Sequence, residues 1–305
     1  MPLSPVPLAS LRGARKRFGD VVALDGIDLD IHPGEVLAVL GANGAGTTTA
    51  LGLLTGLLTA DGGEVSLFGR DPRDPEARQG IGVMLQAAAL PDGLRVAEHV
   101  RLQSAYYGAP RPLAETLALA GIAGLAKRGY GELSGGQQRR VQFALAICGR
   151  APLLFVDEPT TGLDVEARRG FWQVLRELRD AGTAIVLTTH YLEEADALAD
   201  RVVLLAGGRV IAHDTPVALK SRAASRRVRA RTRLPAAVIA VWPEVETVRV
   251  ADGIAEVASA DPEALLRRWL AADDTLAGLE VRALTLEETF LALTGAHHTP
   301  DEEAA

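Results

Sequence analysis

Residues 34–58 read GEVLAVLGANGAGTTTALGLLTGLL, and the class of fold follows from the elements they predict. The opening run is apolar and predicts a buried strand that ends at Gly41. A glycine-rich loop follows, where the backbone can take turns that other residues resist. Beyond the loop, Leu51, Leu54 and Leu58 are spaced by three and four positions, which places them on one face of a helix. The sequence therefore predicts a strand, a glycine loop and a helix in direct succession.

The loop itself, GANGAGTT at positions 41–48, matches the phosphate-binding template GxxxxGK(S/T) at every position except the lysine. In that template the glycines let successive N–H groups turn toward phosphate oxygens, and the helix adds the positive end of its dipole. Thr47 stands where the lysine is expected, and Thr48 stands where a hydroxyl would ligate magnesium. Taken alone, such a loop is as consistent with a plain strand-to-helix turn as with a nucleotide site.

Three further apolar runs, at residues 81–85, 153–157 and 184–189, are short and nearly continuous. Such runs are typical of strands buried on both faces of a mainly parallel sheet. Helices are predicted at residues 95–107, 112–120, 136–148, 165–180 and 191–199. After a β-rich start over residues 8–40, this alternation predicts an α/β fold.

Composition excludes several classes of protein. The 305 residues suffice for two domains, and 48 % of them are hydrophobic, yet no run approaches the roughly 18 apolar residues of a membrane helix. The first residues lack the pattern of an export signal. Cys148 is the only cysteine, which excludes an internal disulfide and fits a reducing compartment. The net charge of −7 argues against a nucleic-acid partner. We therefore expect a cytoplasmic protein.

The character of the sequence changes after Pro216, so we expect a first domain over residues 1–217. Alternating strand and helix patterns then predict a small α+β domain over residues 218–297, which resembles a split βαβ unit. The polar residues 298–305 are expected to form a disordered tail.

Two details of the second domain can be predicted. The arginine-dense segment at residues 221–235 is expected to form a linker and an edge strand. The last helix is expected to begin at Thr285, with Glu288 in capping-box spacing.

The run Leu133-Ser134-Gly135-Gly136-Gln137 precedes the predicted helix 136–148. Ser134 is suited to cap that helix, because its hydroxyl can accept from a free backbone N–H. A serine and glycines at a helix N-terminus also form an anion site. The two roles do not compete.

An acidic pair, Asp157 and Glu158, closes the apolar run LLFVD. One carboxylate at a strand end can hold magnesium while the other orients and polarises an attacking water. In isolation, such a pair is more often only a helix cap.

Four other side chains occupy comparable places. Gln86 follows the run 81–85, His190 follows the run 184–189, and Asp164 precedes a predicted helix. Phe18 lies in the β-rich start. Each also has an ordinary structural interpretation. Gln86 can be a strand cap and His190 a structural histidine. Asp164 can be a helix N-cap, and Phe18 can be an exposed phenylalanine of a strand.

Together these motifs occur in the order found in the ATP-binding-cassette (ABC) transporter family, and the resemblance covers residues 8 to about 217. It implies a P-loop NTPase cassette with a mainly parallel sheet, an antiparallel β subdomain and a helical subdomain. It also implies an ATPase that binds ATP and Mg²⁺. The resemblance assigns catalysis to Glu158, His190 and Gln86, and magnesium binding to Thr48, Gln86 and Asp157. Contacts with ATP are implied for Phe18, Gly41, Asn43, Gly44, Ala45, Gly46, Thr47, Thr48, Thr49, Ser134, Gly135, Gly136, Gln137 and Asp164.

The resemblance also implies partners. In the family the LSGGQ signature of one cassette lies over the P-loop of another, so a head-to-tail dimer is expected, with either an identical or a different subunit. A separate integral-membrane permease is expected to hold the chain at the inner face of the membrane. Residues 188–216 and 285–295 look like the drug- and antibiotic-export branch, whose permeases are of the ABC-2 type.

Thr47 departs from the family pattern. Threonine is short and neutral, whereas the lysine reaches the β- and γ-phosphates with a cation. Losing that contact is expected to cost about 2–4 kcal/mol and to slow turnover by roughly a hundredfold or more. A laboratory substitution, a naturally degenerate site beside an active partner, and slow activity with compensating groups all remain open.

Two other functions remain as alternatives. The chain fits an ATP-binding regulatory module without useful hydrolysis, acting in a heterodimeric transporter. A soluble ABC ATPase of translation or DNA repair would need two cassettes in tandem or a long coiled-coil insert, and the sequence contains neither.

Overall fold

The computed structural model describes residues 6–86, 89–222 and 226–289. The chain divides into two compact units, Met1–Thr215 and Pro216–Ala305. The domain boundary expected from the sequence lies two residues further along. The tail expected at residues 298–305 lies outside the described residues.

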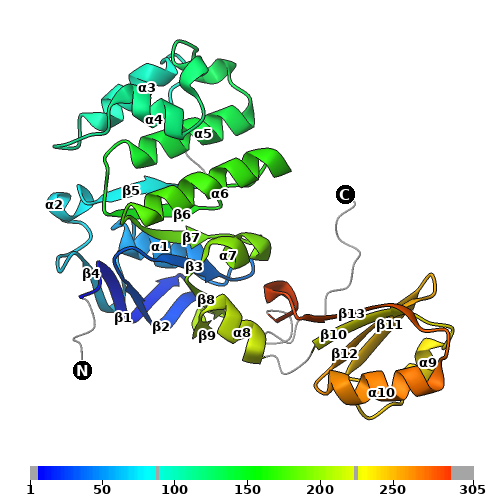
Figure 1. Ribbon diagram of the computed structural model, residues 1–305. Helices are drawn as coiled ribbons and strands as arrows, with labels where there is room; N and C mark the ends of the chain where they lie inside the picture. The colour runs from blue at the N-terminus through cyan, green and yellow to red at the C-terminus, as the bar shows by residue number, and fades with distance from the viewer. Residues whose placement is uncertain (1–5, 87–88, 223–225, 290–305) are drawn as a thin grey trace. The chain divides into compact units, whose positions relative to one another are not determined.

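A six-stranded sheet forms the centre of the first unit (Figure 1), with the strand order β5-β6-β7-β3-β8-β9. All neighbouring strands run parallel except β8 and β9, which form an antiparallel hairpin. The bounds are β3 Val36–Leu40, β5 Ile81–Met84, β6 Leu153–Asp157, β7 Ala184–Thr188, β8 Arg201–Ala206 and β9 Arg209–Asp214. Every residue of β3, β6 and β7 is buried, as expected for strands covered on both faces. The predicted α/β fold is confirmed.

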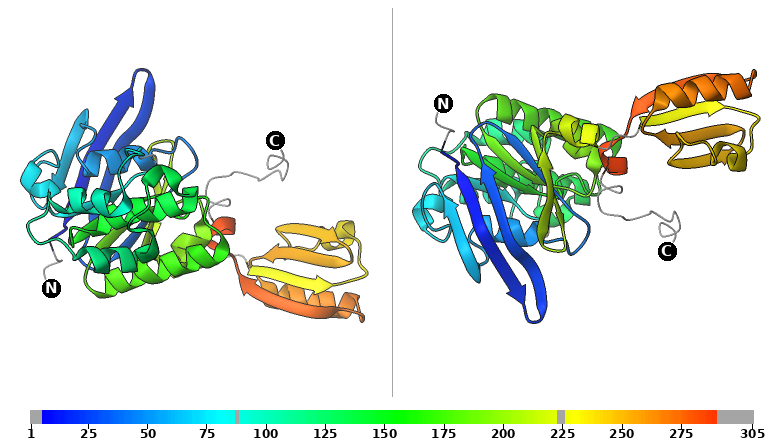
Figure 2. Two further views of the ribbon diagram at one scale, coloured as in Figure 1. Left: turned by 90° about the horizontal axis from the view of Figure 1, so that it is seen from above. Right: turned by 90° about the horizontal axis from the view of Figure 1, so that it is seen from below.

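A second, antiparallel sheet has the order β2-β1-β4. Its strands are β1 Ala9–Phe18, β2 Val21–Ile31 and β4 Gly62–Leu67. Alternate residues such as Leu11 and Leu29 are buried in one core with the helix α1, Thr47–Leu54. The long β1–β2 hairpin is visible in both views of Figure 2.

The remaining helices of this unit, apart from α2, whose Ala77 joins the first core, pack around a second core. They are α2 Pro75–Arg78, α3 Val96–Ser104, α4 Leu113–Leu119, α5 Gly135–Ile147, α6 Val165–Asp180 and α7 Leu192–Leu198, with 3-10 turns at Ala123–Leu125 and Tyr130–Glu132. Phe143 of α5 packs against Phe171 of α6, with 4.4 Å between ring centroids. Figure 1 shows α3, α4 and α5 gathered at one end of the unit, which corresponds to the predicted helical subdomain. Within the described residues, no helix is both long and apolar enough to cross a membrane.

The second unit contains a four-stranded antiparallel sheet with the order β11-β12-β10-β13. Its elements are α8 Pro216–Arg222, β10 Arg226–Arg231, α9 Ala236–Ile239, β11 Thr247–Ala251, β12 Ile254–Ser259, α10 Pro262–Ala272 and β13 Ala277–Ala283. The βαββαβ order from β10 to β13 is that of a split βαβ unit. The buried Val228, Leu265 and Trp269 join the sheet to α10, which lies along one face in Figure 2.

The prediction of an edge strand in this unit was wrong. The arginine-dense β10 lies in the interior of the sheet, between β12 and β13. Cross-strand carboxylates explain how it is accommodated: the guanidinium of Arg229 lies 3.6 Å from Glu256 on β12 and 3.7 Å from Glu280 on β13. The predicted capping box is confirmed, since Thr285 N–H donates to Glu288 (2.8 Å) and Glu288 N–H donates to the Thr285 hydroxyl (3.2 Å).

Candidate functional site

The glycine loop connects the end of β3 to the start of α1, and two of its glycines are required by geometry. A Cβ on Gly41 would lie 2.6 Å from the Ala45 Cβ and 2.7 Å from the Leu205 carbonyl oxygen. Gly46 has a φ of 106°, and a Cβ there would lie 2.5 Å from the carbonyl oxygen of Ala23. The first turn of α1 carries no acidic side chain, so its unpaired N–H groups remain suited to an anion.

Thr47 begins α1 and does not restore the missing cation. Its Cγ2 is directed back at the loop, 3.3 Å from the position that a Cβ on Gly41 would take. Lys16 of β1 and Arg209 of β9 are paired with carboxylates elsewhere: Lys16 pairs with Asp61 at 2.9 Å, and Arg209 pairs with Asp25.

The acidic pair lies at the carboxyl end of β6, two strands away from the glycine loop in the parallel sheet. Asp157 is 3 % exposed, and its Oδ1 accepts a hydrogen bond from the hydroxyl of Thr188 on β7. The Glu158 carboxylate lies 2.6 Å from Nδ1 of His190, which follows β7. Because carboxyl ends of parallel strands share an edge, the loop after β3, His190 and the acidic pair lie along one side of the sheet.

Glu158 has two unusual properties. Its φ is 48°, in the left-handed region that non-glycine residues rarely adopt. Burial raises the pKa of the Glu158 carboxyl above its ordinary value, and the facing His190 opposes that rise. A raised pKa in a carboxylate beside a histidine is typical of a group that accepts a proton.

Sequence reasoning did not identify Arg139 as part of this site. Its side chain, 8 % exposed, donates to the carbonyl oxygens of Leu85 and Gln86 (2.7 and 3.0 Å) and of Asp157 and Glu158 (2.5 and 2.6 Å). A signal was available in the sequence. Arg139 lies four and seven positions before Phe143 and Ala146, which are buried on the same face of α5. Arginine in an apolar stripe indicates a buried polar partner.

The predicted signature residues begin α5. Ser134 and Gln137 form a capping box, in which Ser134 N–H donates to Gln137 Oε1 (3.1 Å) and Gln137 N–H donates to Ser134 Oγ (3.4 Å). Asp164 caps α6 by accepting from Ala167 N–H at 2.8 Å. Ser134, Gly136, Gln137 and Asp164 line one open pocket of about 680 Å³, together with Arg140. The structure thus places the signature residues and Asp164 on a common surface.

Two predicted residues lie apart from these contacts. Gln86 follows β5 and is exposed; the contact that links it to the site is made by its carbonyl, which accepts from Arg139. Phe18 ends β1 on the antiparallel sheet, with its ring 48 % exposed and 5.6 Å from the Lys16 ammonium.

The donor chemistry of the site fits magnesium held jointly with phosphates. Among the residues that the structure describes, no group of three or more His, Cys, Asp or Glu is placed to hold a metal alone. Mg²⁺ prefers oxygen ligands and usually retains waters and substrate phosphate oxygens, so one or two protein ligands suffice. The hydroxyl of Thr48, the amide of Gln86 and the carboxylate of Asp157 supply oxygens of that kind.

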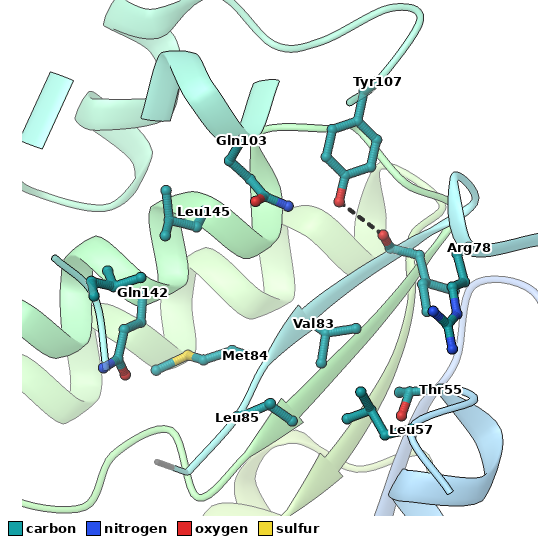
Figure 3. A pocket seen from close by; sticks show the side chains of 12 residues that line it. Thr55, Leu57, Arg78, Val83, Met84, Leu85, Gln103, Tyr107, Gln142 and Leu145 are labelled. Carbon is teal, nitrogen blue, oxygen red and sulfur yellow. Dashed lines mark hydrogen bonds between the residues drawn. The ribbon is translucent and has the colours of Figure 1, made fainter. Parts of the chain in front are cut away.

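A separate apolar groove of about 330 Å³ lies beside β5 (Figure 3). Val83 and Met84 of β5 form its floor, and Leu57, Tyr107 and Leu145 contribute from elements on either side. The Tyr107 hydroxyl donates to the carbonyl of Ile81 at 3.0 Å, which fixes one wall. The sequence contained no signal for this groove, because its lining comes from five separate segments.

Comparison with known proteins identifies the family. Residues 24–161 match the model for the ABC transporter family. The chain is 37 % identical to the daunorubicin/doxorubicin resistance ATP-binding protein DrrA of Streptomyces peucetius, over 100 % of this chain and 98 % of that protein. The chain belongs to the ABC transporter family. It is an ATP-binding subunit of that family, and its enzyme class is ATPase.

Further comparisons agree with this assignment of the ABC subunit. It is 40 % identical to a Nod factor export ATP-binding protein I of Cupriavidus pinatubonensis, over 70 % of this chain and 69 % of that one. A solved ATP-binding subunit of an ABC transporter superposes with a TM-score of 0.66 at 26 % identity, covering 70 % of this chain and 92 % of that one. The dimeric structure of a bacterial ABC transporter cassette superposes with a TM-score of 0.62 at 28 % identity, covering 68 % of this chain and 98 % of that one. The predicted resemblance to the drug-resistance branch is confirmed.

Proposed function

We propose that this chain is the ATP-hydrolysing subunit that energises an ABC-2-type exporter of drugs, antibiotics or other hydrophobic compounds, with turnover reduced by Thr47. The observation that carries the proposal is the contact between Glu158 and His190 at the sheet edge that also holds the glycine loop. A partly buried carboxylate with a raised pKa, paired with a histidine, is suited to polarise a water for attack on a phosphate.

The other residues take roles that follow from their places. The loop from Gly41 to Thr49 would hold the phosphates of ATP, and Thr48, Asp157 and Gln86 would hold magnesium, which neutralises phosphate charge when bound. Phe18 would stack on the adenine. Ser134, Gly135, Gly136, Gln137 and Asp164 would act on the nucleotide of a second cassette in a head-to-tail dimer, since all of them except Gly135 line a pocket separate from their own glycine loop.

The apolar groove beside β5 is the proposed contact with the permease, and its occupant would be a short helical segment with apolar side chains. Leu57 on its rim is 59 % exposed and adjoins the apolar residues Val83 and Leu85 of the groove, so it adds to an apolar surface that a partner can cover. The groove also includes Leu85, directly before Gln86, so a bound segment would touch the chain next to the nucleotide site. Binding there would hold the chain at the inner face of the membrane.

Thr47 supports a second candidate function, an ATP-binding regulatory module in a heterodimeric transporter. In that case the glycine loop would still bind nucleotide through backbone N–H groups, while the partner cassette would hydrolyse it. Intact Glu158 and His190 favour the first function, because a module that only binds has no need of a paired general base.

The deciding experiment measures phosphate release by the purified chain with MgATP. The unaltered chain is compared with Thr47→Lys and with the double variant Thr47→Lys/Glu158→Gln, and ATP binding is measured for all three. Turnover only in Thr47→Lys supports an ATPase whose turnover is limited by Thr47. Binding without turnover in both the unaltered chain and Thr47→Lys supports the regulatory module. Equal turnover in both would contradict the role assigned to Thr47.

A further inference from the structure

Arg139 connects three segments that lie far apart in the chain. It belongs to the second turn of α5, and its Nη1 donates to the carbonyls of Leu85 and Gln86 and to Oε1 of Gln142 (2.9 Å). Its Nη2 donates to the carbonyls of Asp157 and Glu158. One buried guanidinium therefore joins the signature helix, the Gln86 loop and the acidic end of β6.

The backbone is strained at Glu158, where Arg139 donates hydrogen bonds at the end of β6. Glu158 has a φ of 48°, which crowds the Cβ of an L-residue, so surrounding contacts must hold it. Two kinds of contact do so. Glu158 N–H donates to the Thr188 carbonyl at 3.0 Å, and the carbonyls of Asp157 and Glu158, one on each side of the Glu158 Cα, accept from Arg139. If that turn relaxed, the carboxylate would leave His190.

The neighbouring arginine has different surroundings. Arg140 reaches the carbonyl of Gly121 at 3.5 Å and lines the signature pocket. Among the described residues, Arg139 is the side chain whose hydrogen bonds reach both the Gln86 loop and the turn at Glu158.

We propose that Arg139 is a positioning residue, which holds Glu158 in its left-handed turn and couples that turn to the Gln86 loop. The proposal rests on hydrolysis at Glu158, as set out under Proposed function. The chemical reason for arginine is its planar fork, whose two terminal nitrogens reach the carbonyls of two separate segments at once. A lysine at this position keeps the charge but presents a single nitrogen. Movement of the Gln86 loop, next to the apolar groove, would then reach Glu158 through one side chain.

The first test is kinetic and uses the Thr47→Lys chain as the parent, with Arg139→Met, Arg139→Lys and the exposed Arg101→Met as variants. We expect Arg139→Met to lower kcat by roughly a hundredfold while KM for ATP changes less than about threefold, because the phosphate loop is untouched. Arg139→Lys should recover part of kcat, and Arg101→Met should match the parent. The proposal is overturned if Arg139→Met keeps kcat within about threefold of the parent, or if kcat and KM deteriorate together with no recovery by lysine.

The second test needs neither nucleotide nor turnover and uses the unaltered chain. Amide hydrogen exchange is compared between that chain, Arg139→Lys and Arg139→Met. We expect faster exchange at the Glu158 amide in both variants, while amides in the second half of α5 keep their protection. Uniform loss of protection along α5, or an unchanged Glu158 amide, would overturn the proposal. If Thr47→Lys fails to hydrolyse ATP, the proposed function fails, and this second test still decides the role of Arg139.

Discussion

The Glu158 carboxylate and Nδ1 of His190 lie 2.6 Å apart at the carboxyl edge of the central sheet, brought together by the neighbouring strands β6 and β7. Each residue follows its strand closely, so the pairing of the two strands sets the pairing of the two side chains. The arrangement places the carboxylate that we propose as general base beside a residue able to orient it.

Replacing Glu158 by Gln should separate binding from hydrolysis. In the Thr47→Lys chain, Glu158→Gln keeps the shape of the side chain and removes the base, so phosphate release should fall by roughly a hundredfold or more. ATP affinity, measured by calorimetry, should stay within about threefold of the parent, because the glycine loop is unchanged. A variant that hydrolyses ATP as fast as its parent would show that another group acts as base.

Glu194 gives a prediction about pH. It is fully buried on α7 and accepts from Trp172 Nε1 at 2.8 Å, and burial raises the pKa of its carboxyl above the ordinary 4.5. A carboxyl with a raised folded-state pKa stabilises the fold when protonated, and that stability is lost as pH rises through the folded pKa. Glu194→Gln should therefore raise Tm at pH 8, by roughly 2–4 °C for each kcal/mol gained.

The gain from Glu194→Gln should shrink as pH falls and vanish below the unfolded-state pKa. Thermal unfolding at pH 8 and pH 4 checks this. A gain of equal size at both pH values would mean that it arises from packing rather than from the buried charge.

Two glycine substitutions should act in opposite directions. Gly46→Ala places a Cβ 2.5 Å from the Ala23 carbonyl at a φ of 106°, so it should lower the free energy of unfolding by at least about 2 kcal/mol and weaken ATP binding. Gly170→Ala is the matched control, because a Cβ there meets nothing within 4 Å in the middle of α6. It should stabilise the chain by about 0.5–1 kcal/mol through helix propensity. Urea unfolding of both variants measures the difference, and equal effects would be inconsistent with the loop geometry.

Glu288 should support the second unit until acid protonates it. Burial raises its pKa, but hydrogen bonds and charges from Arg282, Thr285 and Arg227 outweigh burial and lower it to about 2. A lowered carboxyl pKa contributes stability above the unfolded value of 4.5 and loses it as pH falls toward about 2. Unfolding by urea can be followed by tryptophan fluorescence of the full chain, with Trp242 and Trp269 reporting on this unit. At pH 6 the Glu288→Gln chain should unfold at a lower urea concentration than the parent, and near pH 2 the two midpoints should converge. Divergence that grows toward low pH would contradict the assigned shift.

A substitution in the apolar groove should abolish permease binding without changing ATP binding or stability. Leu57→Glu adds a charge to an exposed rim position, so ATP binding and Tm should stay unchanged while copurification with a coexpressed ABC-2 permease is lost. Leu270→Glu, at a similarly exposed leucine of α10, is the control and should still copurify. If Leu57→Glu copurifies as well as the parent, the permease binds elsewhere.

Short-range patterns in the amino-acid sequence were enough to predict one group of features. The apolar runs at β3, β6 and β7, the glycine loop at Gly41–Gly46 and the capping residues Ser134 and Asp164 all follow from local spacing and local hydrogen bonding. For that reason the α/β fold and the order of the candidate site residues could be predicted from the sequence alone.

A second group of features depends on tertiary contacts. Arg139 binds four backbone carbonyls, and every residue has a carbonyl, so no residue type marked its partners in the sequence. The left-handed turn at Glu158 receives backbone contacts from β7 and from Arg139 of α5. The interior place of β10 depends on which strands pair with it, and long-range pairing brings Glu256 and Glu280 beside Arg229. Each of these features is set by groups far apart in the chain, which local patterns cannot encode.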